Sequence, residues 1–213
     1  MQQKNLLPQT DVRERQNSCT VDKLSENDLK DFNLDNMNFN KKRQSLAVLC
    51  QQNQQDESLV RYQKSILENV DELKDEAPEV EFFLMEIHFP KYPDRSISLD
   101  LQFGMKENEK CPMKIKEGEE YYIRLHFKVK NDCVVGLKLY NTIKRHGIKV
   151  DSYEEMVGSF APKKHMQIYD MESQIAPSGF LSRGNYKGKL MFVDGDGIVH
   201  MQFDYYFEIV KDW

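Results

Sequence analysis

The chain has 213 residues and a mass of 25.2 kDa, of which 39% are hydrophobic and 31% charged. A net charge of −5 and a pI of about 5.6 argue against wholesale binding to nucleic acid or anionic lipid, although an acidic protein suits a partner with a basic surface. The polar composition indicates that part of the chain lies outside a packed core.

Cysteine and histidine spacings give no sign of a metal site. The four cysteines (Cys19, Cys50, Cys111 and Cys133) form no CxxC pair, and the five histidines lack the spacing of zinc ligands. We expect neither metal nor cofactor, and the separated cysteines fit a reducing compartment. The start MQQKNLLPQT has no apolar core of signal-peptide length, and no stretch is long and apolar enough to span a membrane, which predicts a cytoplasmic protein.

Residues 1–79 are rich in Asn, Gln, Asp, Lys and Ser, and we expect the first 35 or so to be disordered when free. Two later segments have helical spacing: QSLAVLCQ from Gln44 and DESLVRYQKSILENV from Asp56. Asp56 is well placed to cap the second helix. Helices this short are marginal alone and need a surface to pack on, either their own domain or a partner.

From Val80 onward the hydrophobic period changes to two. YYIRLHFKVK (121–130), VHMQFDYYFEIV (199–210) and ISLDLQF (97–103) alternate apolar and polar residues, as half-buried antiparallel strands do. No long helical pattern interrupts this half. The sequence therefore predicts an all-β protein, an immunoglobulin-like β-sandwich over 80–213. Further strands are expected at 80–89, 134–144, 148–153, 165–170 and 185–193.

The stretch FVDGDGIVHMQF (192–203) resembles a calcium loop at first sight. With Gly197 as the sixth residue, the first and twelfth ligand positions fall on Phe192 and Phe203, which offer no side-chain oxygen. We interpret DGDG instead as a hairpin turn between strands 185–193 and 198–210, with its aspartates exposed at one end of the sandwich.

No nucleophile elbow, P-loop or dinucleotide fingerprint is present, so an enzyme is disfavoured. The histidines lie on polar faces or in turns and are interpreted as solvated. The predicted sandwich has many bulky apolar residues that we expect to point inward, which would form either an ordinary core or the wall of a site for a long apolar ligand. Outside the last strand, these are Met156, Phe160, Phe180, Leu181 and Met191.

Several motifs in one order resemble the Rho GDP-dissociation inhibitors. These are IKEGEEYYIRLHFKV, VVGLK, HGIKVD, MVGSFAP, APSGFLSRGNY and the C-terminal IVKDW, while DESLVRYQKSIL resembles that family's second arm helix. The similarity covers about residues 44–213. It implies a sandwich that holds the geranylgeranyl group of a Rho- or Rac-type small GTPase, and an arm (1–79) that binds the GTPase switch regions, in a 1:1 complex of two monomers.

The resemblance also assigns residues. Asp56, Ser58 and Tyr62 of the arm, together with Asp151 and Asp196, correspond to positions that contact the GTPase. For the prenyl pocket the same comparison favours Met113, Leu125, Phe127, Leu137, Phe203 and Tyr205.

The chain departs from the family at two places. Where the family usually has two glutamates near the basic tail of the GTPase, this chain has Gln174 and Ile175, and a position that is usually tyrosine is Glu155. Two other hypotheses stay open. The chain could be a general carrier of prenyl tails that ignores the nucleotide state, or a lipid-modifying enzyme, for which we find no nucleophile and base.

Overall fold

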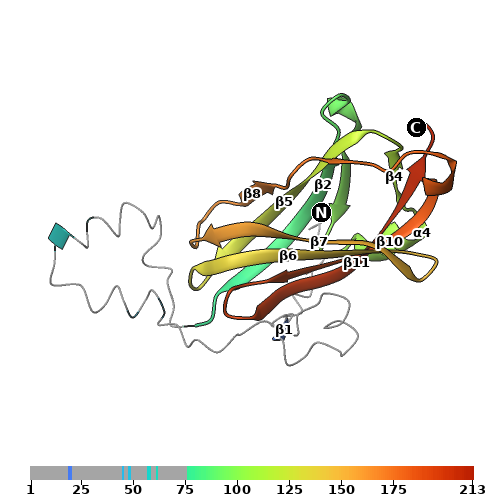
Figure 1. Ribbon diagram of the computed structural model, residues 1–213. Coiled ribbons are helices and arrows are strands. Elements are labelled where there is room, and N and C mark those ends of the chain that lie inside the picture. Colours follow the sequence, from blue (N-terminus) through green and yellow to red (C-terminus); the bar gives the residue numbers. More distant parts are fainter. Residues whose placement is uncertain (1–18, 21–44, 46–47, 49–56, 59–60, 62–75) are drawn as a thin grey trace, which may run out of the picture.

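The computed structural model describes residues 19–20, 45, 48, 57–58, 61 and 76–213. Two β-sheets lie face to face and enclose the core, which confirms the predicted all-β sandwich (Figure 1). Among the described residues, no helix is long and apolar enough to cross a membrane. The strands are β1 (Cys19–Thr20), β2 (Glu79–His88), β3 (Ile97–Asp100), β4 (Met113–Lys116), β5 (Glu120–Lys130), β6 (Val134–Arg145), β7 (Ile148–Phe160), β8 (Gln167–Asp170), β9 (Gln174–Ile175), β10 (Gly184–Val193) and β11 (Ile198–Val210).

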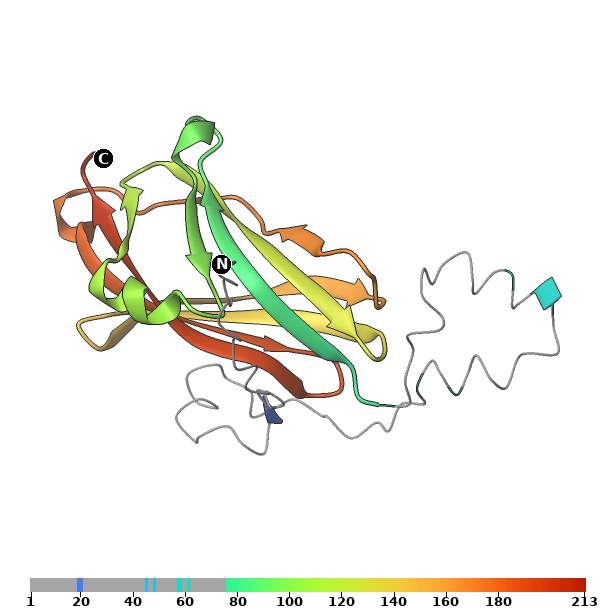
Figure 2. The same cartoon turned by 180° about the vertical axis from the view of Figure 1, so that it is seen from behind.

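The first sheet has the strand order β1–β11–β10–β6–β7, and β4 pairs with β11 in parallel. The second sheet has the order β3–β2–β5–β8, with β9 also paired to β5. All pairs except β4–β11 are antiparallel. A short helix, α4 (Met105–Lys110), connects β3 of one sheet to β4 of the other, as Figure 2 shows from behind.

The core forms because alternate residues of the long strands face the other sheet. On β5, Ile123, Leu125, Phe127 and Val129 are all at most 5% exposed, as their period of two predicts. The ring of Phe82 on β2 stacks on Phe192 of β10 at 4.0 Å, so an aromatic contact joins the two sheets directly. Burial of this apolar surface is the main force that holds the sheets together.

The strand predicted over 97–103 is shorter than expected. β3 ends at Asp100, whose Oδ1 accepts hydrogen bonds from the backbone N–H groups of Gln102 (2.8 Å) and Phe103 (2.9 Å). This aspartate turn redirects the chain into α4, which leaves Phe103 75% exposed instead of buried. In the sequence the apolar alternation continues to Phe103, but the hydrogen bonds that Asp100 accepts end the strand before it.

Three of the bulky residues expected to point inward do not. Met156 is 54% exposed, and Phe180 and Leu181 are each 82% exposed, whereas Phe160 packs against the core and Met191 is buried. Phe180 and Leu181 lie in the 3-10 turn η4 (Phe180–Ser182), outside any strand, so strand alternation does not apply to them. The strand expected at 148–153 extends to Phe160 as β7.

The hairpin predicted at DGDG is confirmed. β10 and β11 pair antiparallel across it, and Gly197 has the positive φ of 83° that such a turn favours. The expectation that both aspartates are exposed was wrong. Asp196 is half-buried, and Asp194 is 4% exposed, with its carboxylate accepting hydrogen bonds from the backbone N–H groups of Asp196 and Ile198. His200, expected to be solvated, is buried beside it.

Candidate functional site

The six residues predicted to line a prenyl site come together in one apolar cluster between the sheets. They derive from β4, β5, β6 and β11, so both sheets contribute. Their side chains fill the interior of the sandwich, and the assignment to a lipid stays a prediction. The exposed fractions are 6% for Met113, 0% for Leu125, Phe127 and Leu137, 5% for Phe203 and 4% for Tyr205.

Tyr205 occupies the interior because the neighbouring strand leaves room for it. Gly188 of β10 pairs with Tyr205 of β11, and a Cβ at Gly188 would overlap the tyrosine ring. The ring therefore lies directly over the glycine backbone. Its hydroxyl is satisfied by Asn141, whose amide nitrogen donates to it at 3.0 Å and whose oxygen lies 3.2 Å away. A lone glycine inside a strand is the sequence signal for such a close approach, and the sequence reasoning missed it.

Tyrosines gather on the side of this cluster that faces β7 and β9. Tyr121 of β5 donates its hydroxyl hydrogen bond to Oε1 of Gln174 on β9 at 3.1 Å. Burial raises the pKa of Tyr121, of Tyr153 on β7 and of Tyr205, so all three hydroxyls stay neutral at physiological pH. For Tyr153, hydrogen bonding to the side chains of Asn141 and Gln174 partly opposes the effect of burial on the pKa. The cluster thus has an apolar body with a neutral polar border.

Glu155 joins the two sheets at the same edge. Its Oε1 accepts a hydrogen bond from the Tyr169 hydroxyl on β8 at 3.0 Å and from the backbone N–H of Glu172 at 3.3 Å. Burial and this contact with Glu155 raise the pKa of Tyr169 to about 12. Glu155 was noted from the sequence only as a departure from the family, and its bridging role could not be read there. We call the border formed by Tyr121, Tyr153, Glu155, Tyr169 and Gln174 the tyrosine edge.

A cavity of about 630 Å³ lies at the other edge of the sandwich, among β3, α4 and β4. Ile97, Leu99 and Met113 give it apolar walls, while Arg95 and Lys114 contribute charge. Met113 is the one predicted prenyl residue in its lining. The cavity therefore adjoins the apolar core through Leu99 and Met113, and Met113 is the residue it shares with the predicted prenyl site.

The two acidic residues predicted to contact a GTPase are far apart on the sandwich. Exposed Asp151 of β7 pairs with Ile143, whereas half-buried Asp196 lies in the turn whose Gly195 N–H donates to the carbonyl of Val135. Val135 and Ile143 are eight positions apart on β6, about 26 Å of strand. A single partner that contacts both must span most of the length of the sandwich, which a small globular domain of roughly 30 Å can do.

The arm is described only in part. Asp56 and Tyr62 lie outside the described residues, whereas Ser58 is helical and exposed. Cys19–Thr20, in the segment expected to be disordered, pairs with Ile198–Val199 of β11 beside the DGDG turn. The role of Ser58 toward a GTPase stays a prediction.

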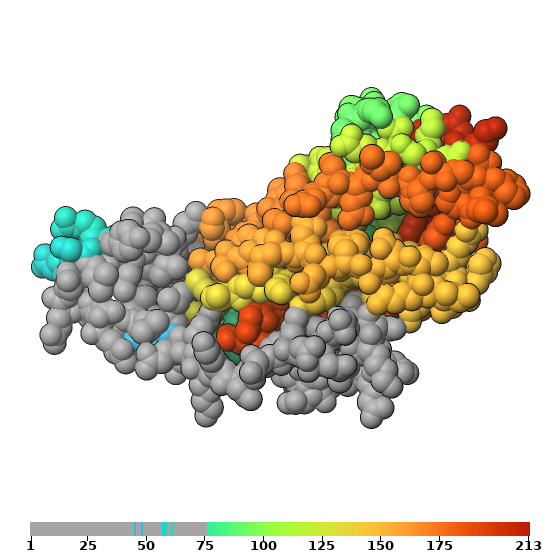
Figure 3. Space-filling view, viewed as in Figure 1, coloured from blue at the N-terminus to red at the C-terminus, as the bar shows by residue number. Residues whose placement is uncertain are grey.

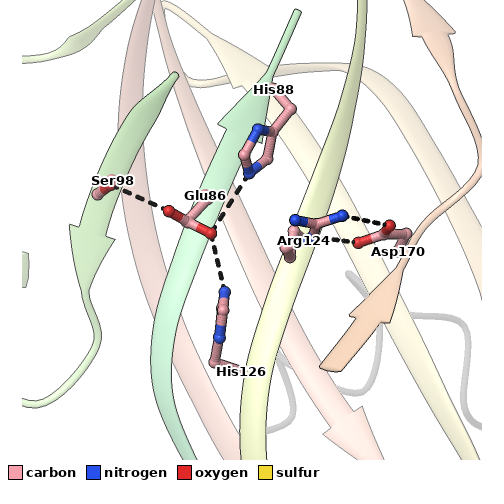
Figure 4. A network of polar contacts seen from close by, with 6 residues as sticks. All are labelled: Glu86, His88, Ser98, Arg124, His126 and Asp170. Atoms are coloured by element: carbon pink, nitrogen blue, oxygen red, sulfur yellow. Dashed lines mark hydrogen bonds and ion pairs between the residues drawn. The ribbon is translucent and has the colours of Figure 1, made fainter. Parts of the chain in front are cut away.

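A separate polar network covers the outer face of the second sheet (Figure 4). Glu86 Oε2 lies 2.8 Å from His126 Nε2 and 3.3 Å from His88 Nε2, and Arg124 holds Asp170 through two hydrogen bonds of 2.6 and 2.7 Å. Burial raises the pKa of Glu86, but the hydrogen bonds from His126 and His88 outweigh it and hold that pKa below its usual value.

Within the described part of the chain, no group of three or more His, Cys, Asp or Glu side chains is arranged to hold a metal ion.

The structure belongs to the class of all-β sandwiches, with an apolar interior enclosed by two sheets. Comparison with known proteins specifies the class. The family profile described as RHO protein GDP dissociation inhibitor matches residues 22–212. The chain therefore belongs to the Rho GDP-dissociation inhibitor family, a family of regulatory proteins.

Individual relatives agree with the profile. A provisionally named rho GDP-dissociation inhibitor 1 of Dictyostelium discoideum is 38% identical over 176 residues, which cover 81% of this chain and 89% of the relative. Rho GDP-dissociation inhibitor 1 of Arabidopsis thaliana is 34% identical over 164 residues, which cover 74% of this chain and 66% of the relative. Rho GDP-dissociation inhibitor 1 of Homo sapiens is 30% identical over 172 residues, which cover 80% of this chain and 84% of the relative.

Proposed function

We propose that this chain binds a GDP-bound, geranylgeranylated Rho-family GTPase, slows release of its GDP and extracts it from membranes. The sandwich holds the lipid between its sheets, and residues 1–79 bind the switch regions through Asp56, Ser58 and Tyr62. Asp151 and Asp196 contact the GTPase at two ends of the sandwich. The protein acts as a cytoplasmic monomer that forms a 1:1 complex, and it needs neither catalysis nor a cofactor.

The observation that carries this proposal is the apolar cluster to which both sheets contribute, with Leu125, Phe127 and Leu137 fully buried at its centre. A twenty-carbon isoprenoid buried there gains roughly 10–16 kcal/mol gross, at about 0.8 kcal/mol per carbon less losses. This is enough to compete with a bilayer for the lipid. Separation of the sheets at the tyrosine edge would admit the lipid, since the contacts there are a few hydrogen bonds worth about 1 kcal/mol each.

Slowing of GDP release needs a second contact, because burial of a lipid tail does not by itself favour one nucleotide state. A segment that binds only the closed switches shifts the population away from the open form that releases GDP. The polar composition and short helical spacings of residues 44–79 suit a segment that orders on binding. A prenyl carrier without such an arm would extract the GTPase and leave its GDP release unchanged.

The test uses liposomes loaded with a GDP-bound, geranylgeranylated Rho-type GTPase. Release of the GTPase and release of labelled GDP are followed for the full chain and for its Asp56→Ala/Tyr62→Ala variant. The proposal predicts that the wild type does both and that the variant slows GDP release much less. Equal behaviour of both proteins, with GDP release unaffected by either, would favour the general prenyl carrier.

A further inference from the structure

Two large apolar side chains are fully presented to solvent at one end of the sandwich. Phe180 and Leu181 are each 82% exposed in the η4 turn, and Ile148 at the start of β7 is 70% exposed. Exposed apolar residues that cluster, instead of lying singly, mark a contact surface. We call Ile148, Phe180 and Leu181 the apolar tip.

The three residues are close together because Arg145 connects their segments. The Arg145 guanidinium donates to the carbonyl oxygens of Leu181 and of Arg183, and Arg145 pairs with Ile148 in the β6–β7 hairpin. Figure 1 and Figure 3 show the hairpin and the η4 loop at the same end of the molecule. The apolar tip is therefore one surface built from two loops.

Hydrogen bonds from neighbouring segments hold the backbone of the η4 loop in place. Tyr186 donates its hydroxyl hydrogen bond to the Ser182 carbonyl at 2.6 Å. The Glu117 carboxylate accepts the Gly179 N–H at 3.0 Å and two hydrogen bonds from Arg183 at 2.6 and 2.9 Å. These contacts fix the backbone while Phe180 and Leu181 point outward. The surface is thus formed in advance, which lowers the entropic cost of binding.

Four cations lie in the two segments that carry the apolar tip, although the protein is acidic as a whole. Lys144, Arg145 and Lys149 lie in the hairpin and Arg183 in the loop, against Asp151 and Glu117, whereas the whole chain carries a net charge of −5. Arg183 pairs with the Glu117 carboxylate, and half-buried Arg145 donates to carbonyl oxygens, so Lys149 is the most exposed of the four cations. Exposed apolar side chains beside an exposed cation fit an anionic lipid surface, because the tip enters the acyl boundary while Lys149 approaches the phosphates.

We propose that the apolar tip and the adjacent Lys149 dock this protein on anionic membranes. The use of this docking rests on the proposed function. β9, which belongs to the tyrosine edge, leads directly into the η4 loop, and the Ala176 N–H donates to the Glu119 carbonyl at 2.9 Å beside it. A sandwich docked through the tip holds its tyrosine edge next to the bilayer, so a prenyl group passes between the two without crossing bulk water.

The first experiment measures binding of the full chain to phosphatidylcholine vesicles with and without phosphatidylserine, by co-sedimentation. The wild type is expected to bind the anionic vesicles in a salt-sensitive manner, and Phe180→Ser/Leu181→Ser to bind them about tenfold more weakly or less. Lys149→Glu tests the cation in the same way. Phe103→Ser is the matched control, because Phe103 is also a highly exposed aromatic residue but lies in the β3–α4 loop. Equal binding by all four proteins, or none by the wild type, overturns the proposal.

A second experiment separates docking from lipid capture. The affinity for a geranylgeranylated peptide in solution should be the same for the wild type and for Phe180→Ser/Leu181→Ser, while extraction of a prenylated GTPase from anionic vesicles becomes several-fold slower. If the wild type fails to bind the peptide, the proposed function is contradicted. The vesicle co-sedimentation then still decides whether the apolar tip docks on membranes. A variant that binds the soluble GTPase more weakly shows that the tip contacts protein, which overturns membrane docking.

Discussion

His200 Nε2 lies 3.0 Å from Asp194 Oδ2 in the interior of the sandwich, and His200 Nδ1 accepts a hydrogen bond from the backbone N–H of Val80 at 3.2 Å. Since Nδ1 accepts, the ring proton is on Nε2 and is donated to the aspartate. One buried side chain therefore connects the DGDG turn with the start of β2, where residues 1–79 join the sandwich. The same turn presents Asp196, a predicted GTPase contact, and Cys19–Thr20 pairs beside it.

Removal of the histidine should be costly. His200→Ala leaves a buried carboxylate and a backbone N–H without their partner, so we expect a loss of about 2–4 kcal/mol in the free energy of unfolding. Urea denaturation measures this change. His165→Ala, at an exposed histidine, is the control and should stay within about 0.5 kcal/mol of the wild type. An equally small effect at His200 would show that the buried contact contributes little.

The close contact between Gly188 and Tyr205 predicts that substitutions at these two positions have non-additive effects on the free energy of unfolding. Gly188→Ala places a Cβ inside the tyrosine ring and should cost about 1–3 kcal/mol in the wild-type background. In a Tyr205→Ala background the same change should cost much less, because the ring is gone. A double-mutant cycle by chemical denaturation gives the coupling energy. Additive effects of the two substitutions would contradict the close approach.

The Glu86 network predicts a dependence of stability on acid. The pKa of Glu86 is lower in the folded protein than its usual value of 4.5, so its contribution is present above that value and is lost as the pH falls through the folded pKa. Glu86→Gln should remove part of this dependence. We expect the variant to be less stable by about 0.5–1 kcal/mol near neutral pH, with a smaller difference below pH 4. Denaturation at a series of pH values checks it; a constant difference across the range would be the contrary result.

Ile175 gives a prediction about partner choice. It is 73% exposed at a position where the family resemblance expects an acidic residue. Ile175→Glu should strengthen binding to a prenylated GTPase with a basic tail several-fold at low salt, and the gain should fade as salt rises. Gln174 is left unchanged in this experiment because it accepts the Tyr121 hydroxyl hydrogen bond. A gain that persists at high salt would point to contacts other than charge.

The sequence predicts the strands well where burial follows a period of two. β5, β10 and β11 fall within about a residue of their expected bounds, since each has one face in the core. β3 was predicted too long because the Asp100 turn depends on a side-chain hydrogen bond that alternation does not encode. Phe180 and Leu181 were expected inside for a similar reason, since hydrophobic character does not reveal a loop that holds them outward.

The candidate site shows the same limit. Leu125, Phe127 and Leu137 could be assigned to one interior, because the resemblance and the strand pattern both place them there. The partners that shape the site could not. Asn141 contacts Tyr205, Glu155 contacts Tyr169 across the tyrosine edge, and His200 contacts the backbone of Val80, so all three acquire their roles from residues distant in the sequence. Long-range pairing of polar groups is a property of the folded state alone.

The central claim, that the lipid lies between the sheets, is tested most directly by methyl NMR of the full chain with a geranylgeranylated peptide that carries a nitroxide at the end of its isoprenoid. The account predicts that the methyl signals of buried Leu125 and Leu137 broaden first, while those of exposed Ile168 on β8 stay sharp. Broadening at Leu181 and Ile148, with Leu125 and Leu137 unaffected, would place the lipid on the surface and contradict the account.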